Sequence, residues 1–172
     1  MKENIVYFAH GKESGPWGTK IVALAKGAKR LGFDVQSPDY SMTMNPDERV
    51  KILLDLKPKA KKNLVLVGSS MGGYVSTVAS RSLKVKGLFL LAPAFYKMKY
   101  ANQDPIPHAK ITTIIHGLND DVVPVDHSIR FAKQYKAQLI LLDSDHRLMD
   151  ALPIVIKYFE IFLREILGKQ EK

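Results

Sequence analysis

The sequence predicts an α/β sandwich, in which a mostly parallel sheet of about five or six strands carries helices on both faces. Short apolar runs rich in β-branched residues alternate with amphipathic helical patterns along the whole chain. The apolar runs are continuous, which is typical of strands that are buried on both faces of a parallel sheet. No repeat, low-complexity segment or Pro/Gly-rich linker interrupts the 172 residues, so we expect a single domain over residues 1–172.

Five apolar runs predict the strands, and a sixth, short strand is a candidate within residues 34–40. The five runs occupy residues 4–9, 63–68, 87–92, 111–117 and 138–143. Helical patterns fill the intervals, at residues 19–32, 47–56, 73–83, 125–135 and 151–167. Gly32 supplies a stop for the first helix, and Asn45 with Pro46 supplies a cap and a first-turn proline for the second. The last helix is apolar with one polar stripe, so we expect it to pack flat on the sheet.

Composition narrows the classes of function. The absence of Cys excludes disulfides and cysteine-ligated metals. No run approaches the roughly 18 apolar residues of a membrane span, and the run at residues 5–9 is too short for a signal-peptide core. We therefore expect a cytoplasmic protein without membrane insertion. The net charge of +9 comes mostly from dispersed lysines, and the densest patch, residues 57–62, is interpreted as a solvated loop. No nucleic-acid partner is expected, and a weak preference for anionic substrates stays open.

The bend at residues 68–73, between a predicted strand and a predicted helix, is the most informative motif. Its sequence, Gly-Ser-Ser-Met-Gly-Gly, lacks the lysine of a phosphate-binding Walker loop. It also carries Ser70 where a dinucleotide-binding fingerprint has its middle glycine. It does match G-x-S-x-G, the nucleophile elbow, in which a strained strand-to-helix turn presents a serine above the sheet. Gly68 and Gly72 leave room for that turn, so Ser70 is the candidate nucleophile and Ser69 its neighbour.

A serine nucleophile needs a base and an acid that orients the base. In elbow folds these follow in the order Ser, Asp or Glu, then His, on loops after later strands. The loop after residues 111–116 carries Asp120 and Asp121, and the loop after residues 138–142 carries His146. The spacing D-x-x-V-P favours Asp120, because it places Val123 and Pro124 at the start of the next helix. Ser70, Asp120 and His146 are therefore the predicted triad.

The other histidines receive structural interpretations. His10 and His116 each end a strand and precede Gly, so we expect them to hydrogen-bond loop backbone. His127 is expected on the surface of a helix, and His108 is uninformative. No pair of histidines or carboxylates has metal-ligand spacing, and a Ser–His–Asp site needs no metal, so no metal or cofactor is expected.

The oxyanion hole is expected to use two backbone N–H groups. Met71 follows the serine at a helix N-terminus, and its N–H points toward the same space. The second donor is assigned to Lys12, in the loop after the first strand, with Gly11 as the alternative. The lysine side chain need not participate.

Four motifs, in order, resemble the α/β-hydrolase superfamily, and more narrowly its small bacterial YqiA-like serine esterases. They are H-G-x-x-S-x-P, G-x-S-x-G-G, H-G-x-x-D-x-x-V-P and D-H, at residues 10–16, 68–73, 116–124 and 145–146. The resemblance covers nearly the whole chain. It implies a three-layer α/β-hydrolase sandwich and a serine esterase. A large cap domain is not expected, because only residues 93–110 are available to cover the site.

The predicted function is hydrolysis of small carboxylic esters through an acyl-enzyme intermediate. Candidates for the substrate pocket are Trp17, Phe95, Tyr96 and Met98; the alternative is that some of them fill the core. The same triad would serve a thioesterase or an amide or peptide hydrolase. A non-catalytic partner-binding protein on the same fold is the alternative from another class. The oligomeric state is left open.

Overall fold

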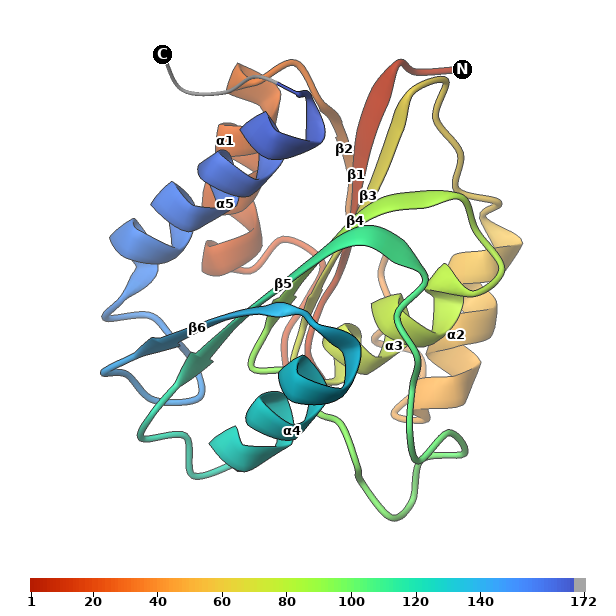
Figure 1. The fold of residues 1–172 in the computed structure, drawn as a ribbon. Helices are drawn as coiled ribbons and strands as arrows, with labels where there is room; N and C mark the ends of the chain where they lie inside the picture. The colour runs from red at the N-terminus through yellow and green to blue at the C-terminus, as the bar shows by residue number, and fades with distance from the viewer. Residues whose placement is uncertain (169–172) are drawn as a thin grey trace.

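The computed structural model describes residues 1–168, and within them six parallel strands form one sheet flanked by five helices (Figure 1). The strands are β1 (Asn4–Ala9), β2 (Asp34–Gln36), β3 (Asn63–Ser69), β4 (Val85–Leu91), β5 (Ala109–Gly117) and β6 (Gln138–Leu142). The helices are α1 (Thr19–Arg30), α2 (Pro46–Asp55), α3 (Met71–Ser80), α4 (Val125–Tyr135) and α5 (Leu152–Ile166). The strand order is β2-β1-β3-β4-β5-β6, and every pairing is parallel. The predicted fold class is confirmed.

The sheet is the middle of three layers. Helices α1 and α5 cover one face, and α2, α3 and α4 cover the other (Figure 1). Successive residues of one strand serve opposite faces: Val65 and Val67 belong to the core under α1 and α5, whereas Leu64 and Leu66 belong to the core on the α4 side. This burial on both faces explains why the strands are continuous apolar runs.

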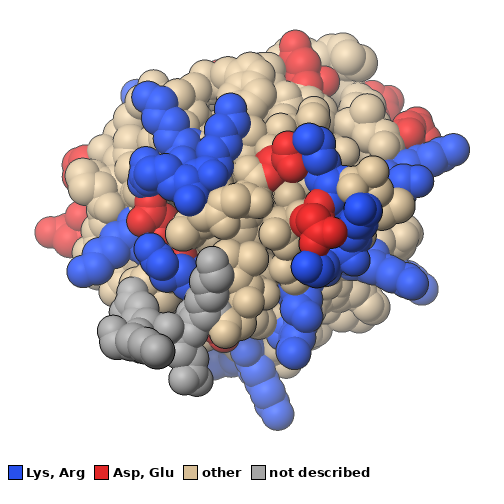
Figure 2. All heavy atoms as spheres, turned by 90° about the horizontal axis from the view of Figure 1, so that it is seen from above, with Lys and Arg blue, Asp and Glu red and all other residues tan. Residues whose placement is uncertain are grey.

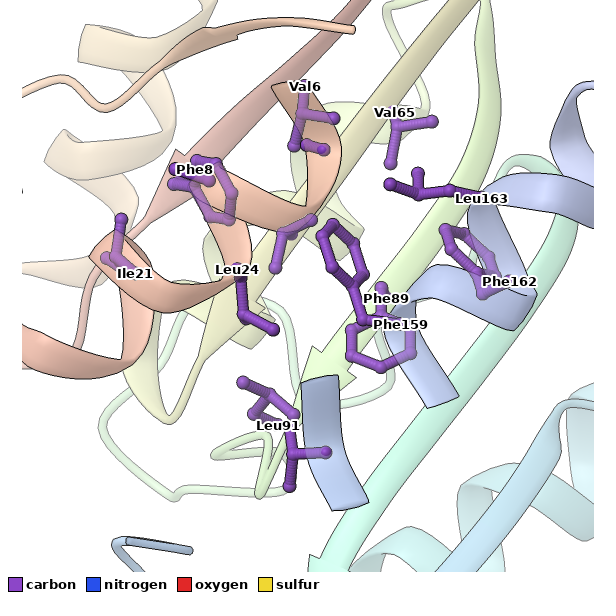
Figure 3. Packing of buried hydrophobic residues seen from close by; sticks show 14 of the residues in the cluster. Val6, Phe8, Ile21, Leu24, Val65, Phe89, Leu91, Phe159, Phe162 and Leu163 are labelled. Atoms are coloured by element: carbon purple, nitrogen blue, oxygen red, sulfur yellow. The ribbon is translucent and has the colours of Figure 1, made fainter. Parts of the chain in front are cut away.

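The core beneath α1 and α5 contains much of the aromatic packing. Phe89 of β4 contacts two rings of α5, with ring centroids 5.0 Å from Phe159 and 5.2 Å from Phe162 (Figure 3). A Cβ on Gly87 would lie 2.6 Å from atoms of Phe162 and Ile166, so the missing side chain lets α5 approach the sheet. The last helix therefore packs flat on the sheet, as the sequence predicts.

All of the predicted elements form, and several of their boundaries are shifted by up to three residues. The helix expected from residue 73 begins at Met71, because Ser70 alone completes the turn out of β3. The short strand expected within residues 34–40 forms only at Asp34–Gln36, where it pairs with β1. Pro38 follows it, and proline cannot donate a ladder hydrogen bond. The cap of α2 is as predicted, with the Asn45 side chain accepting from the backbone N–H of Asp47 at 2.9 Å.

Basic side chains are numerous at the end of the molecule where β1 begins. Figure 2 looks down on this end and shows groups of Lys and Arg with several acidic side chains among them. The loop at residues 57–62 contributes here, and the Nζ of Lys62 lies 2.7 Å from Glu3 Oε2. No helix within residues 1–168 has the length and apolarity needed to cross a membrane.

Candidate active site

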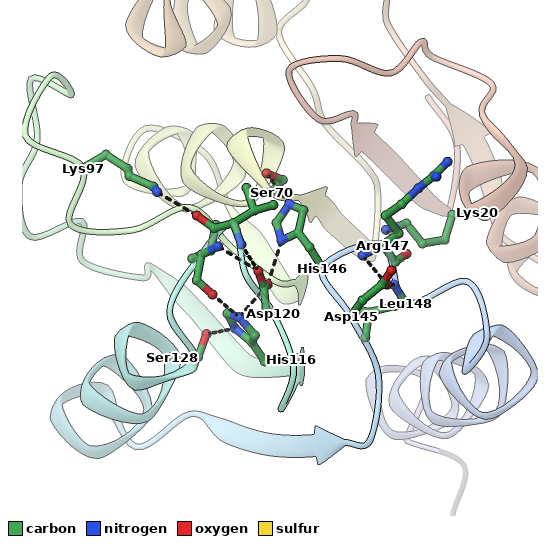
Figure 4. A network of polar contacts seen from close by, with 12 residues as sticks. Lys20, Ser70, Lys97, His116, Asp120, Ser128, Asp145, His146, Arg147 and Leu148 are labelled. Carbon is green, nitrogen blue, oxygen red and sulfur yellow. Dashed lines mark hydrogen bonds and ion pairs between the residues drawn. The ribbon is translucent and has the colours of Figure 1, made fainter.

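The three residues of the predicted triad meet at the carboxyl ends of the strands. Ser70 follows β3, Asp120 follows β5, and His146 follows β6 (Figure 4). The Nε2 atom of His146 lies 3.1 Å from Ser70 Oγ, and its Nδ1 lies 2.7 Å from Asp120 Oδ2. A carboxylate only accepts, so Nδ1 carries the proton and Nε2 is left to accept from the serine hydroxyl.

The turn at Ser70 has the strained backbone that the glycine bend predicts. Ser70 has φ 53° and ψ −117°, outside the regions that L-residues favour. A Cβ on Gly68 would lie 2.2 Å from the carbonyl oxygen of Gly72, and a Cβ on Gly72 would lie 1.9 Å from that of Ala9. Only glycine fits at either position. Hydrogen bonds secure the turn, since Ser70 N donates to Leu91 O at 2.9 Å and Ser70 O accepts from Ala94 N at 3.0 Å.

The Asp120 carboxylate is buried and accepts three hydrogen bonds, with the His116 ring close by. Its Oδ1 accepts from the backbone N–H of Val122 at 2.9 Å and of Val123 at 2.7 Å. Its Oδ2 accepts from His146 and lies 2.9 Å from Nε2 of His116. Burial alone would raise the pKa of Asp120, but the hydrogen bonds from Val123, His146 and Val122 lower it overall. Asp121, by contrast, is exposed. The carboxylate next to His146 is therefore the one that the sequence spacing favours, and it stays ionised.

His116 has a closer relation to the triad than its predicted structural role suggests. It does hydrogen-bond loop backbone, with Nε2 3.0 Å from Val123 O, but the same Nε2 also faces Asp120. Both neighbours of Nε2 are acceptors, so Nε2 carries the proton, and Nδ1 accepts from Ser128 Oγ at 2.7 Å. Burial lowers the pKa of His116, which keeps it neutral. The signal that could have found this contact is the four-residue spacing in H-G-x-x-D.

The loop that carries His146 is fixed from both sides. Asp145 Oδ1 accepts from the backbone N–H of Arg147 at 2.8 Å and of Leu148 at 3.1 Å, and Leu148 is anchored in the core. From α1, the Nζ of Lys20 donates to Arg147 O at 2.9 Å (Figure 4). Burial lowers the pKa of Lys20 to about 8, against the opposing charge of Asp145. Lys20 is a residue near the site that the motifs did not identify.

The two predicted oxyanion donors border Ser70 in the chain and in space. Met71 is the first residue of α3, and Lys12 follows Gly11 in the loop between β1 and α1. A Cβ on Gly11 would lie 3.6 Å from Ser70 Cβ, so this loop passes directly beside the serine. Among residues 1–168, the backbone N–H groups of Met71 and Lys12 have no acceptor. Both are available to bind a ligand oxygen.

The four candidate pocket residues do not line one pocket, although the rings of Phe95 and Tyr96 contact each other. Phe95 is completely buried and stacks on Phe131 of α4 with centroids 4.3 Å apart, so it fills the core. Tyr96 is partly buried under Arg130, whose guanidinium carbon lies 4.0 Å from the ring centroid. Met98 is 94% exposed, and Trp17 is 51% exposed in a groove of about 480 Å³ against α1 and α5. An aromatic residue after a strand looks the same in the sequence whether it lines a pocket or fills a core.

No group of His, Asp or Glu within residues 1–168 has the arrangement of a metal site. A hollow of about 670 Å³, larger than the groove at Trp17, borders the loop that carries His146. It is lined by Asn119, Asp143, Ser144, Asp145, Arg147, Met149 and Asp150. Ser144 and Asp150 are hydrogen-bonded there, so the hollow borders the loop that carries the triad histidine.

A family model and a solved structure match the chain over most of its length. The model of the uncharacterised protein family UPF0227 matches residues 4–104. A crystal structure from Xanthomonas campestris pv. campestris, assigned to the alpha/beta hydrolase superfamily, is 30% identical with a TM-score of 0.85. The alignment covers 95% of this chain and 99% of that one. No curated protein matches.

More distant structures share the fold. Est1E from Butyrivibrio proteoclasticus is 19% identical with a TM-score of 0.78, and the alignment covers 98% of this chain and 90% of that one. A second Xanthomonas campestris protein, described as an α/β serine hydrolase without lid, is 17% identical with a TM-score of 0.71, covering 96% and 83% of the two chains. At these identities the likeness concerns the fold alone.

Proposed function

We propose that this chain, which belongs to the protein family UPF0227 within the α/β-hydrolase superfamily, is a serine hydrolase that cleaves small carboxylic esters. The observation that carries the proposal is the unbroken hydrogen-bonded series from Ser70 Oγ through His146 to the buried Asp120 carboxylate. A binding protein would have no use for a serine held in a strained turn against a histidine whose tautomer is fixed.

The first half of the reaction acylates the serine. His146 Nε2 takes the hydroxyl proton as Ser70 Oγ forms a bond to the ester carbonyl carbon, which gives a tetrahedral oxyanion. The oxyanion then re-forms the carbonyl, the C–O bond to the alcohol breaks, and His146 returns the proton to that alcohol. Asp120 stabilises the imidazolium throughout, because hydrogen bonds from Val122, Val123 and His146 keep its carboxylate ionised.

The second half uses water in place of the alcohol. His146 takes a proton from water as the water oxygen attacks the acyl carbonyl, and the bond to Ser70 Oγ then breaks. The proton returns to Ser70, and the carboxylic acid leaves. In both halves the backbone N–H groups of Met71 and Lys12 stabilise the oxyanion, and each such donor is typically worth about 10²–10³ in kcat.

Short acyl groups suit this site best. The connection between β4 and β5, residues 92–108, is the segment available to cover Ser70, and no separate cap domain forms within residues 1–168. Phe95, one of the candidate pocket residues, is already used in the core. A long acyl chain would therefore bury little apolar surface in this site, and such burial is what would favour long acyl chains over short ones.

The test is a series of p-nitrophenyl esters from acetyl to palmitoyl, with Ser70→Ala and the matched control Ser69→Ala. We expect hydrolysis that is fastest for the shortest chains and is reduced by about 10⁴ or more in Ser70→Ala. Ser69→Ala should keep activity within about tenfold of the unmodified protein, or about 1.4 kcal/mol of barrier. Activity that survives Ser70→Ala, or a rate that climbs steadily to palmitoyl, would contradict the proposal.

A further inference from the structure

Arg49, on α2, is a completely buried arginine with no carboxylate at ion-pair distance within the described chain. Its guanidinium instead donates to backbone carbonyls. Nε donates to Thr43 O at 2.9 Å, and Nη1 donates to Gly11 O at 3.1 Å and His10 O at 3.3 Å. A longer contact of 3.5 Å joins Nη2 to Lys12 O. Burying a charge without a counter-ion is costly, and most of the donors of this guanidinium bind carbonyls of the loop beside Ser70.

The His10 ring also hydrogen-bonds the carbonyl oxygen of Gly11. Its Nδ1 lies 2.8 Å from Gly11 O, and its Nε2 lies 3.0 Å from the backbone N–H of Tyr40. The Tyr40 N–H can only donate, so Nε2 is the acceptor and Nδ1 carries the proton. The Gly11 oxygen therefore receives two donors, one from His10 and one from Arg49.

Fixing the Gly11 carbonyl also fixes the N–H of the next residue. The carbonyl of Gly11 and the N–H of Lys12 belong to one planar trans peptide, in which they point in opposite directions. Two donors hold the oxygen toward the buried guanidinium, so the Lys12 N–H is turned away from it. Gly11 itself lies beside Ser70, and the Lys12 N–H has no other acceptor in residues 1–168.

We infer that Arg49, together with His10, is a positioning residue for the oxyanion hole, acting by locking the Gly11–Lys12 peptide. The inference rests on the proposed serine hydrolase function. Arginine suits this task because its planar fork reaches several carbonyls at once, whereas lysine has a compact head group. An oxyanion hole must be aligned before the reaction, since its donors stabilise charge that develops only in the transition state.

The test compares Arg49→Met and Arg49→Lys with Lys51→Met, an exposed basic residue of the same helix that receives the same replacement. Each variant is assayed with a p-nitrophenyl ester and with the matching thionoester, in which C=S replaces C=O. Sulfur is the weaker acceptor, so the ester-to-thionoester ratio of kcat/KM reports how much the oxyanion hole contributes. A purely structural role would lower the two rates together.

In Arg49→Met we expect kcat on the ester to fall at least about tenfold with KM nearly unchanged, because the lost interaction belongs to the transition state. The ester-to-thionoester ratio should fall with it. Arg49→Lys should lie between Arg49→Met and the unmodified protein, and Lys51→Met should match the unmodified protein in both quantities.

Circular dichroism separates misfolding from misalignment. If Arg49→Met does not fold, Arg49→Lys decides, since it keeps the charge and most of the volume. A folded Arg49 variant with an unchanged ester-to-thionoester ratio would overturn the inference while leaving the serine hydrolase intact. An unmodified protein that hydrolyses no ester and is not acylated at Ser70 would reject the proposed function, and the inference would fall with it.

Discussion

At the residue scale, Ser70 and Asp120 are each held in place by several hydrogen bonds. Ser70 sits in a backbone conformation that costs of order 1–3 kcal/mol and persists because Leu91, Gly73 and Ala94 hold its peptide groups by hydrogen bonds. The Asp120 side chain has no exposed surface, and it accepts hydrogen bonds from the backbone N–H groups of Val122 and Val123 and from His146 Nδ1. The strain and the full set of hydrogen bonds both fall on the residues to which we assign the chemistry.

Asp120 and Asp121 are adjacent in the chain, but only the Asp120 carboxylate contacts His146. Asp120→Asn replaces the carboxylate that orients His146, and such a change can lower kcat by about 10⁴ while the fold persists. Asp121 is exposed, so Asp121→Asn should cost less than about tenfold. The measurement is kcat/KM for both variants on one activated ester.

Circular dichroism of the two variants serves as the folding control for this comparison. A dead Asp121→Asn beside an active Asp120→Asn would move the orienting acid by one residue. If both variants remained active, the loop after β5 would not supply the acid at all.

At the element scale, the sequence predicted the strands, the turn at Ser70 and the site loops, because each depends on residues that are close together in the chain. The five continuous apolar runs became β1, β3, β4, β5 and β6 with small shifts at their ends. Gly68 and Gly72 predicted the elbow because the close contacts they permit lie within a few residues, or on the neighbouring β1. The H-G and D-x-x-V-P motifs placed the loops that carry the site.

The parts that sequence reasoning missed depend on contacts between distant segments. The hydrogen bond from Arg49 to Gly11 O joins residues 38 positions apart, and the one from Lys20 to Arg147 O joins residues 127 positions apart. No periodicity or motif spacing in the sequence predicts either contact. Phe95 was missed for a different reason. The sequence alone does not tell whether an apolar side chain after a strand lines a pocket or, like Phe95, packs in the core. The helix boundary at Met71 was missed because the strained Ser70 shortens the turn to one residue.

At the scale of the whole molecule, buried histidines make folding sensitive to pH. Burial lowers the pKa of both His10 and His116. Below about pH 6.5, the pKa of an unperturbed histidine, the unfolded chain therefore binds more protons at these two residues than the folded protein does. The stabilisation is therefore complete above about pH 6.5 and is lost as the pH falls below it, by at most about 1.4 kcal/mol per pH unit for each histidine. The lowered pKa of Asp120 acts in the same direction at more acidic pH.

Thermal unfolding followed between pH 8 and pH 5 measures this effect. We expect a nearly constant Tm above pH 7 and a progressive fall below about 6.5. A Tm that rises on acidification would show that the two histidines gain protons on folding, and would contradict the neutral tautomers assigned to them.

Labelling with a fluorophosphonate, followed by mass spectrometry of the digested protein, tests whether Ser70 is an activated nucleophile. The phosphonyl group bonds to a serine oxygen as fluoride leaves, so it reports the nucleophile without knowledge of the natural substrate. We predict one adduct per chain, on Ser70, with labelling strongly slowed in His146→Ala. A folded protein that remains unlabelled, or whose adduct lies on Ser69 or elsewhere, would contradict the account.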